Sequence, residues 1–221
     1  IGQEDFDQVL FEQYDRYKEK SIETRRFKHK DIQPLVEALG KENGFSVTNL
    51  GVSIQGRSIS MISAGTGETD VLLWSQMHGD ESTATMAMFD IFNYLKENRG
   101  ILEGLKVHFI PMLNPDGAEL FQRRNAIGID INRDALRLQS PESRILKAAR
   151  DSLEADYVFN LHDQSRYYNA EKTAKPATLS FLAPAFNYEK DMNEKRGDAM
   201  KIIEQPEGLD GYVVVVEEED I

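Results

Sequence analysis

Hydrophobic residues recur along the chain with two different spacings, which predict two kinds of secondary structure. Apolar positions three or four residues apart indicate helices at 4–20, 31–39, 82–95 and 141–154. Short apolar runs bounded by glycine or polar residues indicate strands at 45–52, 58–63, 71–74, 107–113 and 156–161. The first two strands are joined around Gln55-Gly56-Arg57, which favours an antiparallel pair, whereas the later strands alternate with helices. The pattern predicts an α/β fold with a mixed, mainly parallel central sheet flanked by helices.

Two of the predicted helices carry sequence signals at their ends. Asp31 is the expected cap of the helix at 31–39, and Gly40 is its expected stop. Ser140 is the expected cap of the helix that follows it, because Pro141 then stands in the first turn, where a proline costs no hydrogen bond.

Residues of the kind that bind metals follow two of the predicted strands. His78-Gly79-Asp80-Glu81 comes after the strand at 71–74, and His162 comes directly after the strand at 156–161. Open α/β sheets bind ligands at the carboxyl ends of their strands, so His78, Glu81 and His162 converge if these two strands are parallel neighbours. Three ligands, two histidines and one carboxylate, suit a catalytic zinc site, which keeps a fourth position for water or substrate. The chain contains no cysteine that could close such a site.

A His-x-x-Glu sequence occurs often by chance, so the prediction of a metal site depends on motifs farther along the chain. Asn114-Pro115-Asp116-Gly117 follows the strand at 107–113, Arg123-Arg124-Asn125 comes next, and Gly128-Ile129-Asp130-Ile131-Asn132-Arg133 precedes the last strand. In this order the motifs HGDE, NPDG, RRN, GIDINR and NLH resemble those of the zinc-dependent metallocarboxypeptidases, the carboxypeptidase A-like family, in a compact bacterial form. The resemblance covers about residues 50–163.

The resemblance implies a zinc carboxypeptidase-like fold and a metal site. It implies one Zn²⁺ per chain, bound by His78, Glu81 and His162. It also implies that Asp130 accepts a hydrogen bond from His78, which fixes the tautomer of this histidine and raises its basicity.

The resemblance further implies residues that bind the substrate, a peptide with a free C-terminal carboxylate. Asn132 and Arg133 match the pair that holds this carboxylate, and a guanidinium suits the role because it donates two parallel hydrogen bonds to a carboxylate. Arg123 matches the arginine that polarises the scissile carbonyl and stabilises its oxyanion. Arg124 is the alternative for that role.

A general base would complete the implied catalytic site. In the family this base is a glutamate at the end of a late strand, which takes a proton from water and passes it to the leaving amine. The apolar run at 212–216 is followed by Glu217, which is therefore the positional candidate. Glu217 follows His162 more closely than is usual for the family, so an acidic tail, a truncated chain or a glutamate elsewhere are alternatives. Tyr188 and Tyr212 are candidates for the family's mobile tyrosine.

Composition narrows the class of function. The net charge of −12, from 26 basic and 38 acidic residues, argues against a general attraction to nucleic acid or anionic membranes. No apolar run approaches the roughly 18 to 20 residues that a membrane helix requires, so we expect no membrane insertion. The chain begins at Ile1 without methionine. The family resemblance favours a periplasmic or extracellular location, which removal of a leader peptide would fit. The sequence indicates no oligomeric state.

The length of the chain suits one catalytic domain with a small extension. We expect residues 1–44 to form an N-terminal helical extension packed on the core. We expect residues 45–221 to form a zinc carboxypeptidase-like catalytic domain, which is C-terminally incomplete if the family's closing elements lie beyond it.

The leading functional hypothesis is a zinc-dependent carboxypeptidase that hydrolyses C-terminal peptide bonds through a metal-activated water. One alternative is a related zinc amidohydrolase that acts on cell-wall peptides or acylated amino acids, since compact relatives of the family use similar motifs. Another is a catalytically silent, zinc-retaining module that binds peptides, because the sequence leaves the general base open.

Overall fold

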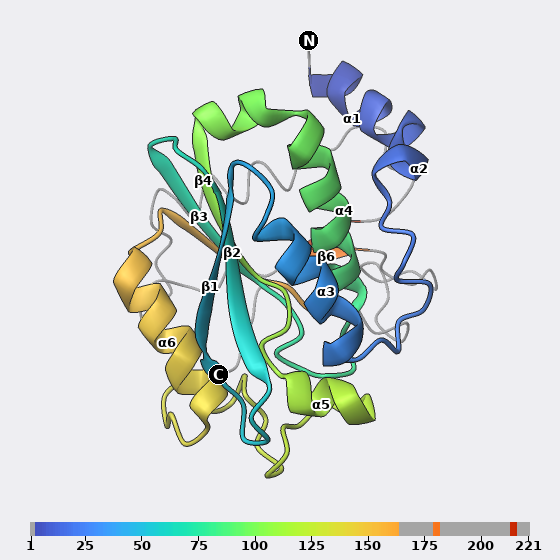
Figure 1. Cartoon of the computed structure of the whole chain (residues 1–221). Coiled ribbons are helices and arrows are strands. Elements are labelled where there is room, and N and C mark those ends of the chain that lie inside the picture. The colour runs from blue at the N-terminus through green and yellow to red at the C-terminus, as the bar shows by residue number, and fades with distance from the viewer. Residues whose placement is uncertain (1–2, 164–178, 182–212, 216–221) are drawn as a thin grey trace. The chain divides into compact units, whose positions relative to one another are not determined.

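The computed structural model describes residues 3–163, 179–181 and 213–215 (Figure 1). The chain divides into two compact units, residues 1–163 and residues 164–221. In the second unit, the strands β6 (Leu179–Phe181) and β7 (Val213–Val215) pair in parallel. The first unit contains all the other described elements and the residues of the predicted metal site.

The first unit begins with helices and continues with strands and helices in alternation. Its elements are α1 (Gln3–Glu12), α2 (Tyr14–Tyr17), α3 (His29–Leu39), β1 (Phe45–Val52), β2 (Ser58–Gly65), β3 (Thr69–Trp74), α4 (Thr83–Glu97), the 3-10 helix η1 (Arg99–Glu103), β4 (Leu105–Ile110), α5 (Pro115–Leu120), α6 (Pro141–Leu153) and β5 (Tyr157–Asn160). The helix predicted at 4–20 is instead two short helices, because the backbone leaves the helical conformation at Gln13.

The five strands of the first unit form one mixed sheet in the order β1-β2-β4-β3-β5. β2 pairs antiparallel with both β1 and β4, whereas β3 pairs parallel with both β4 and β5. In the pairing of β3 with β5, Trp74 lies opposite Asn160. The fold class is therefore confirmed, and the carboxyl ends of β3 and β5 lie next to each other at one edge of the sheet.

Helices cover both faces of this sheet (Figure 1). α3 and α4 pack on one face, where Val71 and Leu73 of β3 meet their apolar side chains. α6 packs on the other face, where Leu72 and Trp74 of β3 lie. Successive side chains of β3 thus enter two separate hydrophobic clusters, which explains why this short central strand is apolar throughout its second half.

The helix caps agree only in part with the sequence signals. Ser140 caps α6 as predicted, because its side chain accepts a hydrogen bond from the backbone N–H of Ser143 and Pro141 follows it. Asp31 is not the cap of α3, which begins earlier, at His29. Lys28 occupies the cap position, and the Asp31 carboxylate accepts a hydrogen bond from the Lys28 backbone N–H at 2.8 Å. Asp31 thus stabilises the first turn from inside the helix.

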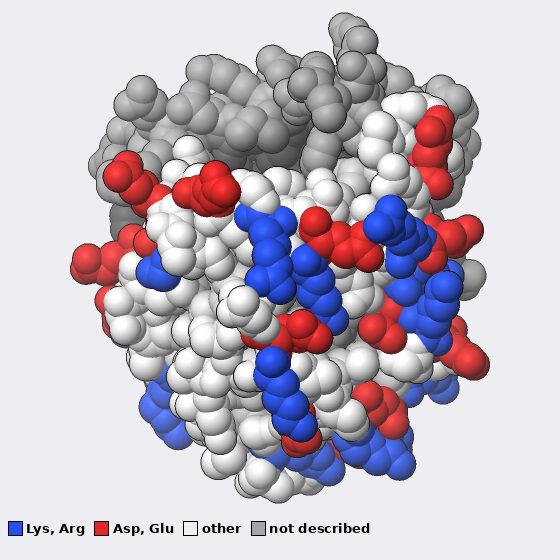
Figure 2. Space-filling view, turned by 45° about the horizontal axis from the view of Figure 1, so that its top comes forward, with Lys and Arg blue, Asp and Glu red and all other residues white. Residues whose placement is uncertain are grey.

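Within the described part of the chain, no helix has the length and apolar character needed to cross a membrane. On the face that Figure 2 shows, Lys and Arg side chains lie interspersed with Asp and Glu side chains. Among the described residues on this face, no large patch of one sign of charge is seen.

Phe92 of α4 lies at the centre of the cluster between α4 and the sheet. It is 1% exposed and packs edge-to-face against Phe45, Phe89 and Phe109. Replacing Phe92 by alanine should lower the free energy of unfolding by about 3–5 kcal/mol, because a buried ring is lost and a cavity remains. The neighbouring Ile91, which is 39% exposed, supplies the control, and Ile91→Ala should cost much less. Urea denaturation measures both, and equal costs would contradict this description of the core.

Candidate metal centre

The segments that follow β3 and β4 leave the sheet side by side. The backbone N–H of Leu113 donates to the carbonyl of Ser75, and that of Asn114 donates to the carbonyl of Gln76. Beyond β5, the N–H of Leu161 donates to the carbonyl of Trp74 at 2.9 Å. These bonds continue the parallel pairing past the ends of the strands, and they carry the segments with the predicted ligands in a common direction.

Gln76 fixes the loop that leads to the first ligand. Its backbone has a positive φ of 49°, which is uncommon for a residue with a side chain. The side chain is 1% exposed, donates to the carbonyl of Gly79 at 3.0 Å and accepts from the Thr85 hydroxyl at 2.9 Å. The loop between β3 and α4 is therefore held by hydrogen bonds from within the protein.

The HGDE and NPDG motifs touch each other backbone to backbone. A Cβ atom on Gly79 would lie 2.1 Å from the carbonyl carbon of Gly117, so only glycine fits at this position. Asn114 caps α5 by accepting a hydrogen bond from the Gly117 N–H at 2.9 Å. The NPDG motif thus supports the loop that carries His78 and Glu81.

The aspartate of the NPDG motif also has a structural role. The buried Asp116 carboxylate accepts hydrogen bonds from the Ser53 hydroxyl at 2.7 Å, the Gln55 N–H at 2.9 Å and the Arg57 guanidinium at 2.7 Å. These bonds fasten the turn between β1 and β2 to α5. The sequence carries no signal for this role of Asp116, because its partners lie about sixty residues earlier in the chain.

His78, Glu81 and His162 converge in the structure. One possible ligand atom from each residue can be chosen so that all three lie within 4.8 Å of one another. The two oxygens of Glu81 lie between the histidines: Oε1 is 2.8 Å from His78 Nδ1, and Oε2 is 2.6 Å from His162 Nδ1. His78 is 2% exposed, whereas the His162 side chain is 31% exposed. The cluster is therefore closed on the His78 side and accessible on the His162 side.

Asp130 contacts the His78 ring at Nε2, on the side opposite Glu81. Its Oδ1 lies 3.2 Å from His78 Nε2 and accepts from the backbone N–H of Asn132 at 3.1 Å. Its Oδ2 accepts from Arg123 Nε at 2.9 Å. A histidine that donates from Nε2 to a carboxylate presents the lone pair of Nδ1 on its opposite side, which is the side that faces Glu81.

This arrangement fits a bound cation. If neutral His78 donates from Nε2 to Asp130, its Nδ1 and the Glu81 Oε1 are both acceptors, and acceptors 2.8 Å apart need a proton or a metal ion between them. Two imidazole nitrogens and one carboxylate are a donor set that suits zinc. His78, Glu81 and His162 could therefore hold this metal, and Asp130 would orient the first of them.

The charges of the cluster favour the same interpretation. Burial raises the pKa of Glu81, but when the facing nitrogens of His162 and His78 carry protons instead of a metal, their hydrogen bonds and charges lower it more, to about 2. Burial likewise raises the pKa of Asp130, yet the hydrogen bond and charge of Arg123 and the contact with His78 bring it below its usual value. Both carboxylates are thus ionised at neutral pH and offer negative charge to a cation.

Of the two adjacent arginines, Arg123 lies at the cluster and Arg124 does not. Arg123 Nη1 is 3.3 Å from Glu81 Oε1 and 3.2 Å from His78 Nδ1. Arg124 donates instead to the carbonyl of Gly128 at 2.9 Å, within its own loop. The structure therefore brings Arg123, and not Arg124, to the ligand cluster.

The remaining predicted site residues are less closely tied to the cluster. Asn132 is half-buried and Arg133 is exposed, both in the turn after Asp130. Among the described residues, the Arg133 side chain has no hydrogen bond or ion pair, which leaves its guanidinium free for a ligand. Glu217, the candidate base, and the tyrosines Tyr188 and Tyr212 lie outside the described residues. The roles of all these residues in binding and catalysis stay predictions.

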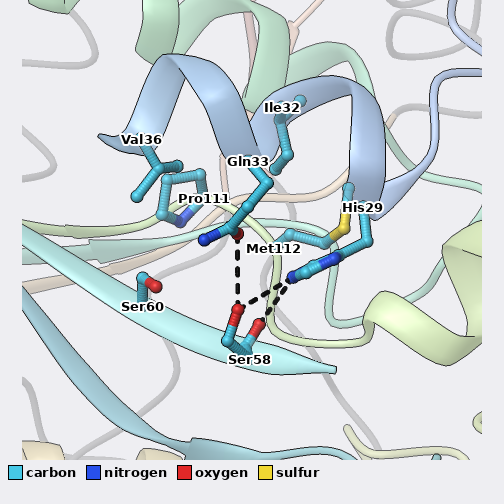
Figure 3. Close-up of a pocket in the computed structure, with 8 residues that line it drawn as sticks. All are labelled: His29, Ile32, Gln33, Val36, Ser58, Ser60, Pro111 and Met112. Atoms are coloured by element: carbon cyan, nitrogen blue, oxygen red, sulfur yellow. Dashed lines mark hydrogen bonds between the residues drawn. The ribbon is translucent and has the colours of Figure 1, made fainter. Parts of the chain in front are cut away.

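The other two histidines of the chain make contacts elsewhere. Figure 3 shows a pocket between α3 and β2 in which His29 and Gln33 point toward Ser58. His29 Nε2 lies 3.0 Å from the Ser58 carbonyl, and the pocket encloses only about 10 Å³, about the space of one water. His108 lies within the sheet between Ser63 and Asp70. Neither residue belongs to the ligand cluster.

Comparison with known proteins shows the family to which the chain belongs. The sequence model of the zinc carboxypeptidase family matches residues 36–173, more than half of the chain. The chain belongs to this family. Carboxypeptidase SOL1 of Arabidopsis thaliana is 30% identical over an alignment of 142 residues that covers 50% of this chain and 28% of that protein. Members of the zinc carboxypeptidase family are zinc enzymes that act on peptides.

Solved carboxypeptidase structures share the fold. The carboxypeptidase A from Helicoverpa armigera superposes with a TM-score of 0.64 and 15% identity over 96% of this chain and 64% of its own. The metallo-carboxypeptidase from Burkholderia cenocepacia superposes with a TM-score of 0.59 and 24% identity over 62% of this chain and 41% of its own. The chain spans only about a third or less of the length of the curated relatives that it matches.

The lowered pKa of Glu81 predicts a pH-dependent contribution to stability in the metal-free protein. The ionised carboxylate stabilises the fold fully above its unfolded pKa of about 4.5, and this contribution is lost as the pH falls toward about 2. The difference in free energy of unfolding between the protein and its Glu81→Gln variant should therefore shrink as the pH falls from 5 to 2. Urea denaturation in the presence of a chelator measures this difference, and a constant value across that range would contradict the prediction.

Proposed function

We propose that this chain carries the catalytic centre of a zinc-dependent carboxypeptidase that hydrolyses C-terminal peptide bonds. The observation that carries the proposal is the convergence of His78, Glu81 and His162 at the carboxyl ends of β3 and β5. Membership of the zinc carboxypeptidase family supports it. The accessible side of the cluster, at His162, leaves room for a water or a substrate carbonyl next to the three ligands.

Zinc in this site would supply a Lewis acid and lower the pKa of a bound water. His78, Glu81 and His162 would hold it, with Asp130 keeping the Nδ1 lone pair of His78 directed at the metal. The Asp130 carboxylate also holds Arg123 by its Nε, so that Nη1 is presented at the cluster. Arg123 is thereby positioned to donate to the scissile carbonyl as negative charge develops on its oxygen.

The substrate's carboxylate needs a partner close to this centre. Arg133 and Asn132 follow Asp130 directly in the chain, and the guanidinium of Arg133 is exposed. We assign the terminal carboxylate to these two side chains, because an arginine can hold it with two charge-assisted hydrogen bonds. Glu217 remains our candidate for the residue that takes the proton of the attacking water and gives it to the leaving amine.

The metal site predicts the zinc content of the purified protein. After reconstitution and dialysis, the protein should contain about one zinc per chain, since three protein ligands make one catalytic site. His162→Ala should lose the metal, whereas His29→Ala, which removes a histidine bonded to Ser58, should keep it. Elemental analysis measures this content. Absence of zinc from the unaltered protein, or its retention by the His162 variant, would refute the proposed ligand set.

The carboxypeptidase activity predicts a requirement for a free C-terminus. A peptide that is cleaved with a free carboxylate should resist cleavage when that end is amidated. Arg133→Ala should lower kcat/KM by about 10- to 100-fold, since a hydrogen bond to a charged group contributes about 1.5–3 kcal/mol. Arg137→Ala, another exposed arginine of the same loop, is the control and should change little.

The same assay separates the alternatives. Equal cleavage of the amidated peptide would point to an endopeptidase or amidohydrolase. Zinc-dependent binding of the free peptide, without any hydrolysis, would point to a binding module and would contradict the proposal.

A further inference from the structure

His162 lies at a position where the sheet gives it little support. The last backbone bond between its segment and the sheet is the one from the Leu161 N–H to the Trp74 carbonyl. Among the described residues, the His162 backbone itself makes no such bond. Its ring nevertheless has to remain beside Glu81 for a metal to find three ligands together. A further contact close to His162 would therefore help to keep its ring beside Glu81.

Asp163 provides such a contact. Its Oδ1 accepts from the Thr83 backbone N–H at 3.0 Å, and its Oδ2 accepts from the Thr83 hydroxyl at 3.1 Å. The same Oδ2 accepts from the guanidinium of Arg25. The Asp163 side chain is only 11% exposed. The residue after the third ligand is thus fastened to the first turn of α4, which directly follows the loop with the other two ligands.

Arg25 connects this contact to the N-terminal segment. Its backbone carbonyl accepts a hydrogen bond from Ser82, the buried residue before α4, at 2.7 Å. The segment between α2 and α3 is itself fixed, since Ile22 and Phe27 are both 5% exposed in the main hydrophobic cluster. Arg25 therefore reaches Asp163 from an anchored backbone. It also precedes residue 36, where the match to the family begins.

We propose that Arg25 and Asp163 form a positioning pair that holds His162 against His78 and Glu81 and so raises the affinity of the site for zinc. The inference rests on the zinc site of the proposed function. Neither residue touches the metal or the substrate. The pair acts by restricting the position of the segment that carries His162, as residues that orient metal ligands do in other proteins. The N-terminal segment thereby becomes part of what shapes the metal centre.

Charge alone predicts the opposite effect, which makes the proposal testable. Removing the positive charge of Arg25 from the neighbourhood of a cation site should tighten binding if only electrostatics mattered. Removing a positioning contact should weaken it. The sign of the change in zinc affinity of the Arg25→Ala variant therefore separates the two explanations, whereas both predict weaker binding by Asp163→Asn.

The test is the zinc dissociation constant, measured by competition with a chromophoric chelator on the full chain. Arg25→Ala and Asp163→Asn should each weaken zinc binding by about 10-fold or more, because partners that orient metal ligands typically contribute 10- to 100-fold. Arg25→Lys should restore part of the loss, since it keeps the charge and one donor. The loss of zinc affinity in the double variant should not exceed the two single losses multiplied together, because both substitutions remove the same contact.

Arg16→Ala is the matched control. It removes another exposed arginine in an ion pair, with Glu97, that makes no contact with the ligand segments. Zinc affinity should not change in this variant. The urea midpoint of the metal-free Arg25→Ala protein should also stay close to that of the unaltered chain, because Thr83 still holds Asp163.

Unchanged or tighter zinc binding in the Arg25→Ala variant would overturn the proposal, whatever the Asp163→Asn variant shows. An equal loss in Arg16→Ala, or a loss that follows the urea midpoint, would do the same, since either would indicate a general effect on the fold. The measurement also separates this inference from the proposed function. An unaltered chain that binds no zinc refutes both, whereas a chain that binds zinc through this pair but cleaves no peptide refutes only the carboxypeptidase.

Discussion

β3 and β5 lie side by side and run in the same direction, so the segments that follow them leave the sheet at one edge. Everything at the metal centre depends on this pairing. His78 and Glu81 come from the segment after β3, and His162 comes from the segment after β5, about eighty residues later in the chain. An antiparallel pairing would send the two segments to opposite edges of the sheet, and no rearrangement of side chains could bring the ligands together.

The parallel pairing brings the ligand segments close, and hydrogen bonds and tight packing then fix them. The Gln76 side chain holds the loop after β3, while Gly79 and Gly117 allow two backbones to touch. Asp130 then orients His78 and Arg123 with one carboxylate. The two carboxylates of the cluster contact the Arg123 guanidinium and the rings of His78 and His162, and the pKa of each carboxylate is lowered, so both remain ionised in a partly buried site at neutral pH.

The sequence predicted the sheet better than it predicted the supports of the site. β1 has the predicted bounds, and the apolar runs located β3 and β5 to within a few residues. The side chains of β3 enter the core on both faces, whereas Val158 and Phe159 of β5 are exposed. The order β1-β2-β4-β3-β5 was not predictable in this way, since it depends on pairing between distant strands. The ligand residues were found because histidine and glutamate at strand ends carry a chemical signal and because the motifs that follow them resemble those of the metallocarboxypeptidases.

Asp130 was predicted from the family resemblance, but the other residues that hold these ligands carry no such signal. The positive φ of Gln76 reflects the loop around it, and the bonds of Asp116 and Asp163 join residues that are far apart in the chain. A short α5 between two loops was likewise missed, because six residues are too few for a hydrophobic period to be visible. Such contacts follow from the fold, and they become readable only once it is known.

The central claim, that one metal ion is bound by two imidazoles and one carboxylate, can be tested by X-ray absorption at the zinc edge of the zinc-loaded protein. We predict a first shell of four or five nitrogen and oxygen atoms, with zinc–nitrogen distances of about 2.0–2.1 Å and the multiple-scattering signature of two histidine rings. A shell of about six oxygen atoms, or one with the signature of fewer than two imidazoles, would contradict the account.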